Sequence, residues 1–206
     1  KHFHQLASDG HTRRTMLKLG ALLHDIAKPQ TKIVAANGKT RFLGHHTLGA
    51  SMSRKILRRL RMSNSGIEMA CGMIEHHLRP TQMSHGAELP TPRAVFRYFR
   101  DVGDVAIDTL YLSLGDHLAA KGPEIDMIGW QRHADIVSHI LQVGTQQHSQ
   151  EKLPKLVTGH DLIREFGLPP GPLIGNLLDE LQEAHAAGEF DTLEEALAWA
   201  RHRQTG

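Results

Sequence analysis

The sequence has very little cysteine and no long apolar run. Cys71 is its one cysteine in 206 residues, so an internal disulfide is excluded and a reducing compartment is favoured. No apolar stretch approaches the roughly 20 residues that a membrane-spanning helix needs. The first residues, KHFHQLASDGHTRR, lack the apolar core of a secretory signal. We therefore expect a cytoplasmic protein that makes no use of a membrane.

Strong overall charge is also lacking. The formal net charge is +2, and the hydrophobic (40%) and charged (22%) fractions are those of an ordinary globular protein. The totals alone therefore do not indicate a nucleic-acid-binding protein. The length fits one fair-sized domain, or one domain with a small addition, and the first residue is not methionine, which suggests a fragment or a processed chain. Histidine is the abundant exception, because 16 histidines are scattered along the chain.

Helical periodicity dominates and predicts an all-α fold. Between residues 12 and 28, apolar residues recur every three or four positions, and Pro29 is expected to end that helix. A short β-hairpin is expected near residues 31–42, around Asn37-Gly38. Further helices are predicted from about 45 to 60, from about 65 to 79, and over 91–101, 104–120 and 124–147.

Helix-capping patterns mark the remaining boundaries. Ser65 with Glu68 is a capping-box pattern, and Pro80 would close the helix that it opens. The polar segment HSQEKLPKLV, residues 148–157, predicts a break between a domain over 1–150 and a helical subdomain over 151–206. Three short helices are expected in the subdomain, the first capped by Thr158 with Asp161, the second over 171–187 and ending at Gly188, and the third capped by Asp191 with Glu194.

The stretch LLHDIAKP, residues 22–29, carries a histidine and an aspartate near the end of a helix that looks built for a core. A buried, unpaired carboxylate costs several kcal/mol, so Asp25 needs a partner. One interpretation is a hydrogen-bonded pair of His24 and Asp25. The other is a divalent metal ion, because imidazole and carboxylate both ligate first-row metals.

Further histidines and an aspartate favour the metal when they are taken together. His45-His46 opens the second predicted helix, and His76-His77 lies near the end of the third. His77 comes three residues after Ile74 and so borders the apolar face. Asp116 is the one charged residue of its apolar stretch. Each could be an ordinary helix-end residue, but four helices that converge in a bundle can gather metal ligands in this way.

LLHDIAKP, followed by GHH, EHH and a late aspartate, resembles the HD superfamily of metal-dependent phosphohydrolases. Longer stretches, such as FLGHHTLGASMSRKILRRLRMS and TGHDLIREFGLPPGPLIGNLLDELQEAHAAGEFDTLEEALAWA, resemble the C-terminal half of bacterial tRNA nucleotidyltransferase and poly(A) polymerase-type proteins. The resemblance implies an HD helical bundle over 1–150 and the family's RNA-side helices over 151–206. It also implies one or two divalent metal ions bound by His24, Asp25, His45, His76, His77 and Asp116. Asp25 would bridge two ions, and Lys28 and Arg79 would contact phosphate unless they are solvated helix-end cations.

The chain departs from the family pattern in two ways. The family's first histidine lies upstream of the HD doublet, where only His2, His4 and His11 are available. ASDGHTRR is expected to be a loop leading into the HD helix. A nucleotidyltransferase head needs a glycine-serine turn followed by paired aspartates, and the sequence contains no such motif. We therefore do not expect this chain to add nucleotides by itself.

Three functions remain open at this point. The first is hydrolysis of a phosphomonoester or phosphodiester of a nucleotide, a cyclic phosphate or an RNA end, with Mn, Fe, Co or Ni favoured over Mg because imidazole ligands suit those metals. The second is a non-catalytic body that binds RNA, such as tRNA, through the basic stripe RKILRRLR at residues 54–61. Trp199 and Phe190 are interpreted as core anchors rather than as a stacking platform for bases. The third is sensing of a phosphorylated nucleotide; the oligomeric state is open.

Overall fold

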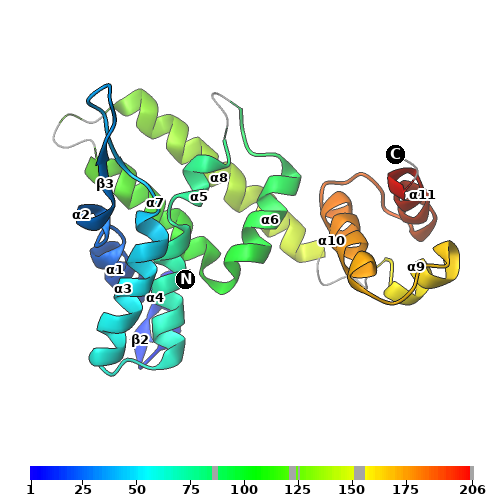
Figure 1. Ribbon diagram of the computed structural model, residues 1–206, viewed down its shortest axis with the longest axis horizontal. Helices are drawn as coiled ribbons and strands as arrows, with labels where there is room; N and C mark the ends of the chain where they lie inside the picture. Colours follow the sequence, from blue (N-terminus) through cyan, green and yellow to red (C-terminus); the bar gives the residue numbers. More distant parts are fainter. Residues whose placement is uncertain (85–87, 121–123, 125, 151–155, 205–206) are drawn as a thin grey trace. The chain divides into compact units, whose positions relative to one another are not determined.

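The structure is a computed structural model that describes residues 1–84, 88–120, 124, 126–150 and 156–204 (Figure 1). The predicted all-α class is confirmed. The α-helices of the described residues are α1 (Arg13–Leu23), α2 (Lys28–Thr31), α3 (His45–Arg59), α4 (Asn64–His76), α5 (Arg79–Gln82), α6 (Pro92–Val102), α7 (Ala106–Ala120), α8 (Met127–Gln150), α9 (Gly159–Phe166), α10 (Pro172–Ala186) and α11 (Leu193–Gln204). Short 3₁₀ helices span His2–His4 and Gly103–Val105.

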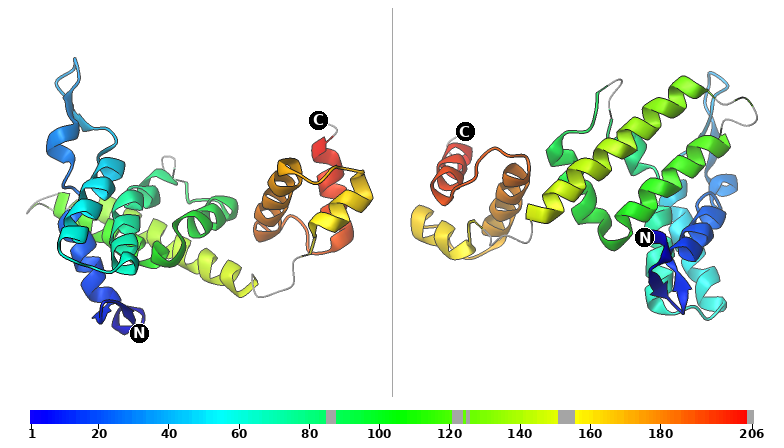
Figure 2. Two further views of the ribbon diagram at one scale, coloured as in Figure 1. Left: turned by 60° about the horizontal axis from the view of Figure 1, so that its bottom comes forward. Right: turned by 180° about the vertical axis from the view of Figure 1, so that it is seen from behind.

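The hairpin expected near residues 31–42 is present. Strands β3 (Lys32–Val34) and β4 (Thr40–Phe42) pair antiparallel, with Ile33 opposite Arg41. The turn includes Gly38 at φ +75°, a conformation that favours glycine. The hairpin extends away from the neighbouring helices (Figure 2), and its chain then leads directly into α3.

A second hairpin corrects the loop expected at ASDGHTRR. Strands β1 (Leu6–Ser8) and β2 (His11–Thr12) pair antiparallel around Asp9-Gly10. Both turn residues have positive φ, 54° for Asp9 and 73° for Gly10. A two-residue Asp-Gly turn with this backbone is the usual hairpin connection, so the signal for the hairpin was present in the sequence.

The first compact unit comprises Lys1–Leu89 and Asp101–His139. Its helices α1, α3, α4 and α7 pack on one another, with α4 in contact with the other three. Helices α3 and α4 lie side by side in Figure 1. The apolar faces meet at fully buried side chains, among them Met16, Leu57, Met73, Ile74 and Leu110. These faces follow the spacing of three and four that the sequence shows.

The HD doublet lies where α1 stops, and this corrects the helix predicted over 12–28. Helix α1 ends at Leu23, and His24 is its C-cap residue, with its backbone N–H donating to Gly20 O at 2.9 Å. Pro29 does not end the helix; it lies in the first turn of the short helix α2, where its missing N–H needs no partner. Residues 24–27 therefore form a turn between α1 and α2, and the HD doublet begins that turn.

Three further local predictions are wrong in detail. Ser63, not Ser65, caps α4, because its Oγ accepts from Gly66 N at 3.1 Å. Pro80 lies in the first turn of α5 rather than closing α4. At α11 the capping side chain belongs to Thr192 and the reciprocal carboxylate is that of Glu195, one position beyond the Asp191 and Glu194 pattern.

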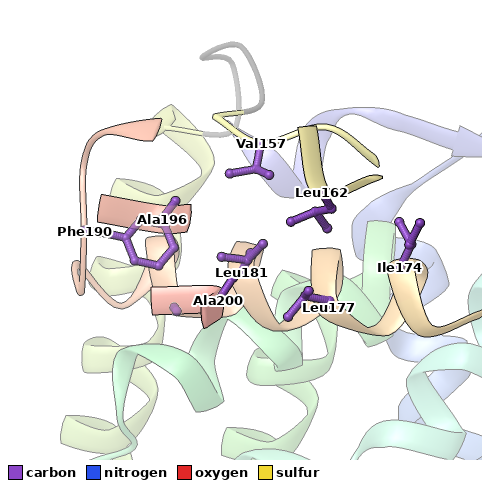
Figure 3. Close-up of a cluster of buried hydrophobic side chains, with 9 residues drawn as sticks. Val157, Leu162, Ile174, Leu177, Leu181, Phe190, Ala196 and Ala200 are labelled. Atoms are coloured by element: carbon purple, nitrogen blue, oxygen red, sulfur yellow. The ribbon is translucent and has the colours of Figure 1, made fainter. Parts of the chain in front are cut away.

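The second compact unit comprises Pro90–Arg100 and Ile140–Gly206. Helices α9, α10 and α11 enclose a cluster of buried apolar side chains, shown in Figure 3: Val157, Leu162, Ile174, Leu177, Leu181, Phe190, Ala196 and Ala200, together with Ala184. The predicted capping box of Thr158 and Asp161 opens α9. Phe190 is in the core, and Trp199 packs against it while its Nε1–H donates to Glu189 Oε2 at 3.0 Å.

The domain boundary predicted at residue 150 stays a prediction. It adjoins residues 151–155, which lie outside the described residues. The two contact-defined units divide within α8, after His139. Among the described residues, no helix combines the length and the hydropathy that crossing a membrane would require.

Candidate metal centre

Three histidines at helix ends are oriented by the same kind of hydrogen bond. Nδ1 of His24, of His45 and of His77 each donates to the backbone carbonyl three residues earlier, at 2.8, 2.7 and 2.7 Å. A carbonyl oxygen only accepts, so each Nδ1 carries the hydrogen. In the neutral ring, Nε2 then carries a lone pair. Backbone hydrogen bonds of this kind commonly fix the ring and the tautomer of a metal-ligating histidine.

The free ring nitrogens converge with two carboxylates. His24 Nε2 lies 3.3 Å from both Asp25 Oδ2 and Asp116 Oδ1. His45 Nε2 lies 3.5 Å from Asp25 Oδ1 and 3.2 Å from His77 Nε2. Two three-residue groups result, one of His24, His77 and Asp116 and the other of Asp25, His45 and His77, each with its ligand atoms within 4.8 Å of one another.

These side chains fit a metal ion better than they fit one another. The Nε2 atoms of His45 and His77 face each other at 3.2 Å, and two lone pairs cannot form a hydrogen bond. Asp25 Oδ1 is buried and has no hydrogen-bond partner among the described residues. Buried acceptors left in this way are costly unless a cation satisfies them. A set of imidazole nitrogens and carboxylate oxygens is a donor set for a first-row divalent metal.

The electrostatics of the protein show how strongly the centre attracts positive charge. Burial lowers the pKa of His24, but hydrogen bonds to Asp116 and Asp25 outweigh burial and raise that pKa to about 10. Burial would raise the pKa of Asp25, yet hydrogen bonds from His24 and Lys28 hold it below its usual range. The hydrogen bond to His24 also lowers the pKa of Asp116. Burial lowers the pKa of His77 to about 4, which keeps this ring neutral and able to ligate.

The structure brings five of the six predicted metal ligands together and leaves His76 out of both groups. His76 lines a neighbouring pocket with Arg79, whose Nη2 donates to Asp101 Oδ2 at 3.0 Å. Lys28 is part of the centre, because its Nζ lies 2.5 Å from Asp25 Oδ2.

The upstream histidines do not join the centre. His2 is hydrogen-bonded to the buried Asp108 at 3.2 Å, and neither His4 nor His11 belongs to either ligand group among the described residues. Asp108 also forms an ion pair with Arg13. Sequence reasoning missed this buried ion pair, because its two partners are far apart along the chain.

Comparisons with known proteins show the family to which the chain belongs. The family model described as HD domain matches residues 1–121, more than half of the chain, and the chain therefore belongs to the HD domain family. A second family model, described as tRNA nucleotidyltransferase domain 2 putative, matches residues 132–200. The chain is thus homologous to the C-terminal, HD-containing half of tRNA nucleotidyltransferases.

The curated relatives that the chain matches are longer than the chain. It is 30% identical over 200 residues to an A-adding tRNA nucleotidyltransferase of Deinococcus radiodurans, covering 96% of this chain and 44% of the relative. It is 31% identical over 196 residues to a CC-adding tRNA nucleotidyltransferase of Thermus thermophilus, covering 92% of this chain and 40% of the relative. A bifunctional uridylyltransferase/uridylyl-removing enzyme of Nitrosococcus oceani is 25% identical over 152 residues, covering 73% and 15%. The chain spans less than half the length of each.

Proposed function

We propose that this chain hydrolyses phosphomonoesters or phosphodiesters with one or two divalent metal ions held by His24, Asp25, His45, His77 and Asp116. The observation that carries the proposal is the set of unsatisfied acceptors at the centre, namely the facing Nε2 atoms of two histidines and the buried Asp25 Oδ1. Matching the HD domain family supports it. So does the relative whose name includes a uridylyl-removing activity.

The ligand set favours particular metals and a particular stoichiometry. Three imidazole nitrogens favour Mn, Fe, Co or Ni over Mg, which prefers oxygen ligands. Both three-residue groups use His77, and its Nε2 offers a single lone pair. One protein-derived set of three ligands can therefore be complete at a time. A second ion would depend on His24 and Asp116 with solvent or substrate oxygens.

The protein's own residues have separable tasks in this reaction. When bound, a divalent ion polarises phosphate oxygens and lowers the pKa of a bound water towards neutrality. The carbonyls of Ala21, Phe42 and Ile74 orient the three rings, and Lys28 keeps Asp25 ionised. Arg79 is proposed as a second cation for the phosphate, with its guanidinium positioned by Asp101.

The test begins with metal content, measured by mass spectrometry on the purified chain before and after incubation with Mn or Ni. Release of p-nitrophenolate from bis(p-nitrophenyl) phosphate then reports hydrolysis. We expect bound metal and hydrolysis in the parent, and loss of both in His77→Ala. His160→Ala is the matched control, because His160 is exposed on α9. A parent chain that binds no metal in excess Mn or Ni would contradict the proposal.

A second function, RNA binding by the same chain, is supported by a separate observation. Residues 26–67 contain nine lysines and arginines and no aspartate or glutamate, although the whole chain has 24 lysines and arginines and 22 aspartates and glutamates. Most of these cations are exposed on the β3–β4 hairpin and on α3, while Arg54 is paired with Glu68. The relatives of Deinococcus radiodurans and Thermus thermophilus that the chain matches are named as tRNA nucleotidyltransferases.

RNA binding and hydrolysis separate experimentally. Binding of a tRNA transcript through this cationic surface should weaken steeply as salt rises, because phosphate contacts release counterions. Replacing Lys55, Arg58 and Arg59 by glutamine should make the plot of log affinity against log salt concentration less steep, by the amount expected for about three phosphate contacts. His77→Ala should leave RNA binding unchanged. Binding that depends on neither salt nor these three residues would contradict this second function.

A further inference from the structure

A cavity of about 220 Å³ lies in the first unit at the N-terminal end of α3 and the C-terminal end of α4. No part of the ligand groups lines it. The lining residues that matter here are His46, Thr47, Glu75, His76, Arg79 and Gln82. We call this cavity the α3–α4 pocket.

The α3–α4 pocket and the metal centre use neighbouring residues of the same two helix ends. His46 follows the proposed ligand His45, and His76 precedes the proposed ligand His77. Consecutive residues of a helix point about 100° apart around its axis, so one side chain of each pair faces the centre and the other faces the pocket. The ring centroids of His45 and His46 are 5.9 Å apart. The two sites are therefore formed by adjacent residues of the same two helix ends.

The chemistry of the lining is that of a neutral polar ligand with a flat face. Thr47, Glu75 and Gln82 offer hydroxyl, carboxylate and amide groups, which donate and accept hydrogen bonds in directions set by the ligand. The rings of His46 and His76, with Leu78, offer flat or apolar surface. The lining carries both the carboxylate of Glu75 and the guanidinium of Arg79, whose Nη2 donates to Asp101, so its charge alone does not select an anion.

One atom of the lining has hydrogen-bonding capacity that the protein does not use. His46 Nδ1 is buried and has no hydrogen-bond partner among the described residues. Pockets for drug-sized ligands are usually about 300–1,000 Å³. A cavity of 220 Å³ is therefore suited to a single ring system rather than to a whole nucleotide.

We propose that the α3–α4 pocket binds the nucleobase of the substrate whose phosphate reaches the metal centre. Proteins recognise unstacked bases by stacking on aromatic side chains, histidine included, and by hydrogen bonds to the base edge. The substrate class would then be a nucleotide or a terminal nucleotide of RNA, not a simple phosphate ester. This inference rests on the proposed phosphoester site for its phosphate, but the pocket can be tested without catalysis.

The direct test is binding of the four ribonucleosides, which carry no phosphate, followed by nuclear magnetic resonance of the histidine ring protons. We expect saturable binding of at least one nucleoside. Thr47→Val and Gln82→Ala should each weaken it about five- to tenfold, the effect of one hydrogen bond. Ser51→Ala on the exposed side of α3 and Gln30→Ala on α2 are the matched controls and should bind as the parent does.

Kinetics provide a second readout that a merely structural role would not move. With the p-nitrophenyl ester of a nucleoside 5′-phosphate, the two pocket variants should raise KM and leave kcat unchanged. With bis(p-nitrophenyl) phosphate, which has no base, they should behave as the parent. If neither ester is cleaved, the proposed function fails, while nucleoside binding still decides the pocket. Absence of saturable nucleoside binding, equal affinity in the variants, or displacement by inorganic phosphate would overturn the inference.

Discussion

Glu183 in the second unit and Asp25 in the first unit are partnered in opposite ways. In the second unit, Glu183 is 6% exposed and fully paired: Arg97 Nε and Arg100 Nη1 each donate to it at 2.8 Å. In the first unit, Asp25 has one oxygen near His24 and Lys28, while the other, Oδ1, is buried without a hydrogen-bond partner among the described residues. Removing one partner of a paired buried carboxylate destabilises a fold, whereas an unpaired carboxylate oxygen beside groups with shifted pKa values is a candidate ligand.

The difference extends to the cores around these carboxylates. In the second unit, helices α9, α10 and α11 surround a cluster that is made of apolar side chains (Figure 3). The first unit places imidazoles and carboxylates where the ends of α1, α3 and α4 meet α7. The apolar cluster of the second unit favours stability, whereas the polar centre of the first unit sacrifices some stability for a site, as functional centres commonly do.

The largest expected effect is loss of the centre. Asp25→Ala removes the carboxylate between His24 and His45, so we expect loss of bound metal and a fall in hydrolysis of about a thousandfold, the scale of several kcal/mol of metal catalysis. Metal content and p-nitrophenolate release measure both. Asp179→Ala, at an exposed position of α10, is the matched control. Full metal content in Asp25→Ala would contradict the role of Asp25 as a metal ligand, and with it the contrast between Asp25 and Glu183.

The second effect concerns the apolar core. Leu162 is fully buried in the second unit, and Leu162→Ala should lower the free energy of unfolding of that unit by about 3 kcal/mol. Hydrogen exchange of α9, α10 and α11 measures the change, and metal content should stay at the parent level. Leu173→Ala is the control, because Leu173 is 58% exposed. A loss of metal in Leu162→Ala would show that the two units are not independent.

The third effect tests the paired carboxylate. Glu183→Ala leaves Arg97 and Arg100 without this partner, but both are about half exposed, so water offsets much of the penalty. We expect a loss of about 1–3 kcal/mol in the free energy of unfolding, below the range for fully buried pairs.

The same carboxylate gives a pH dependence with a definite sign. Two arginines outweigh burial and hold the pKa of Glu183 below its ordinary value of 4.5. Its contribution is therefore present above pH 4.5 and is lost as the pH falls through the lower folded pKa. Urea unfolding at pH 6 and at progressively lower pH should show the loss in the parent and little of it in Glu183→Gln. Equal acid sensitivity of the two proteins would contradict this role.

Helices and the HD doublet could be predicted from the sequence because they depend on local periodicity and on adjacent residues. The cap of α4 could not: SNS offers several candidates, and Ser63 is selected by Asp9, whose Oδ1 accepts from Ser63 N at 3.1 Å across 54 positions. The end of α1 is likewise set by contacts that hold His24 and Asp25 away from a continuing helix.

His76 and His77 show what helical spacing can predict about the direction of a side chain. His77 follows the buried Ile74 by three residues and donates Nδ1–H to its carbonyl, so the apolar face indicated the residue that points inwards. The α3–α4 pocket was beyond such reasoning. Its lining comes from the outer sides of α3 and α4 and from α5, and no periodicity marks residues that face a cavity.

The last expected effect, smaller than loss of the centre, is a pH dependence of metal binding at the unpaired centre. The raised pKa of His24, about 10, means that a proton occupies Nε2 in the metal-free protein at neutral pH. A metal ligated by His24 must displace that proton, so affinity should rise with pH, by up to tenfold per unit between about pH 7 and 9. Competition with a chromophoric chelator measures it. His24→Gln should bind more weakly and with a flatter pH dependence, while His160→Ala should follow the parent. Affinity that does not change with pH in the parent would exclude His24 as a ligand and would leave it as a charged partner of Asp25 and Asp116.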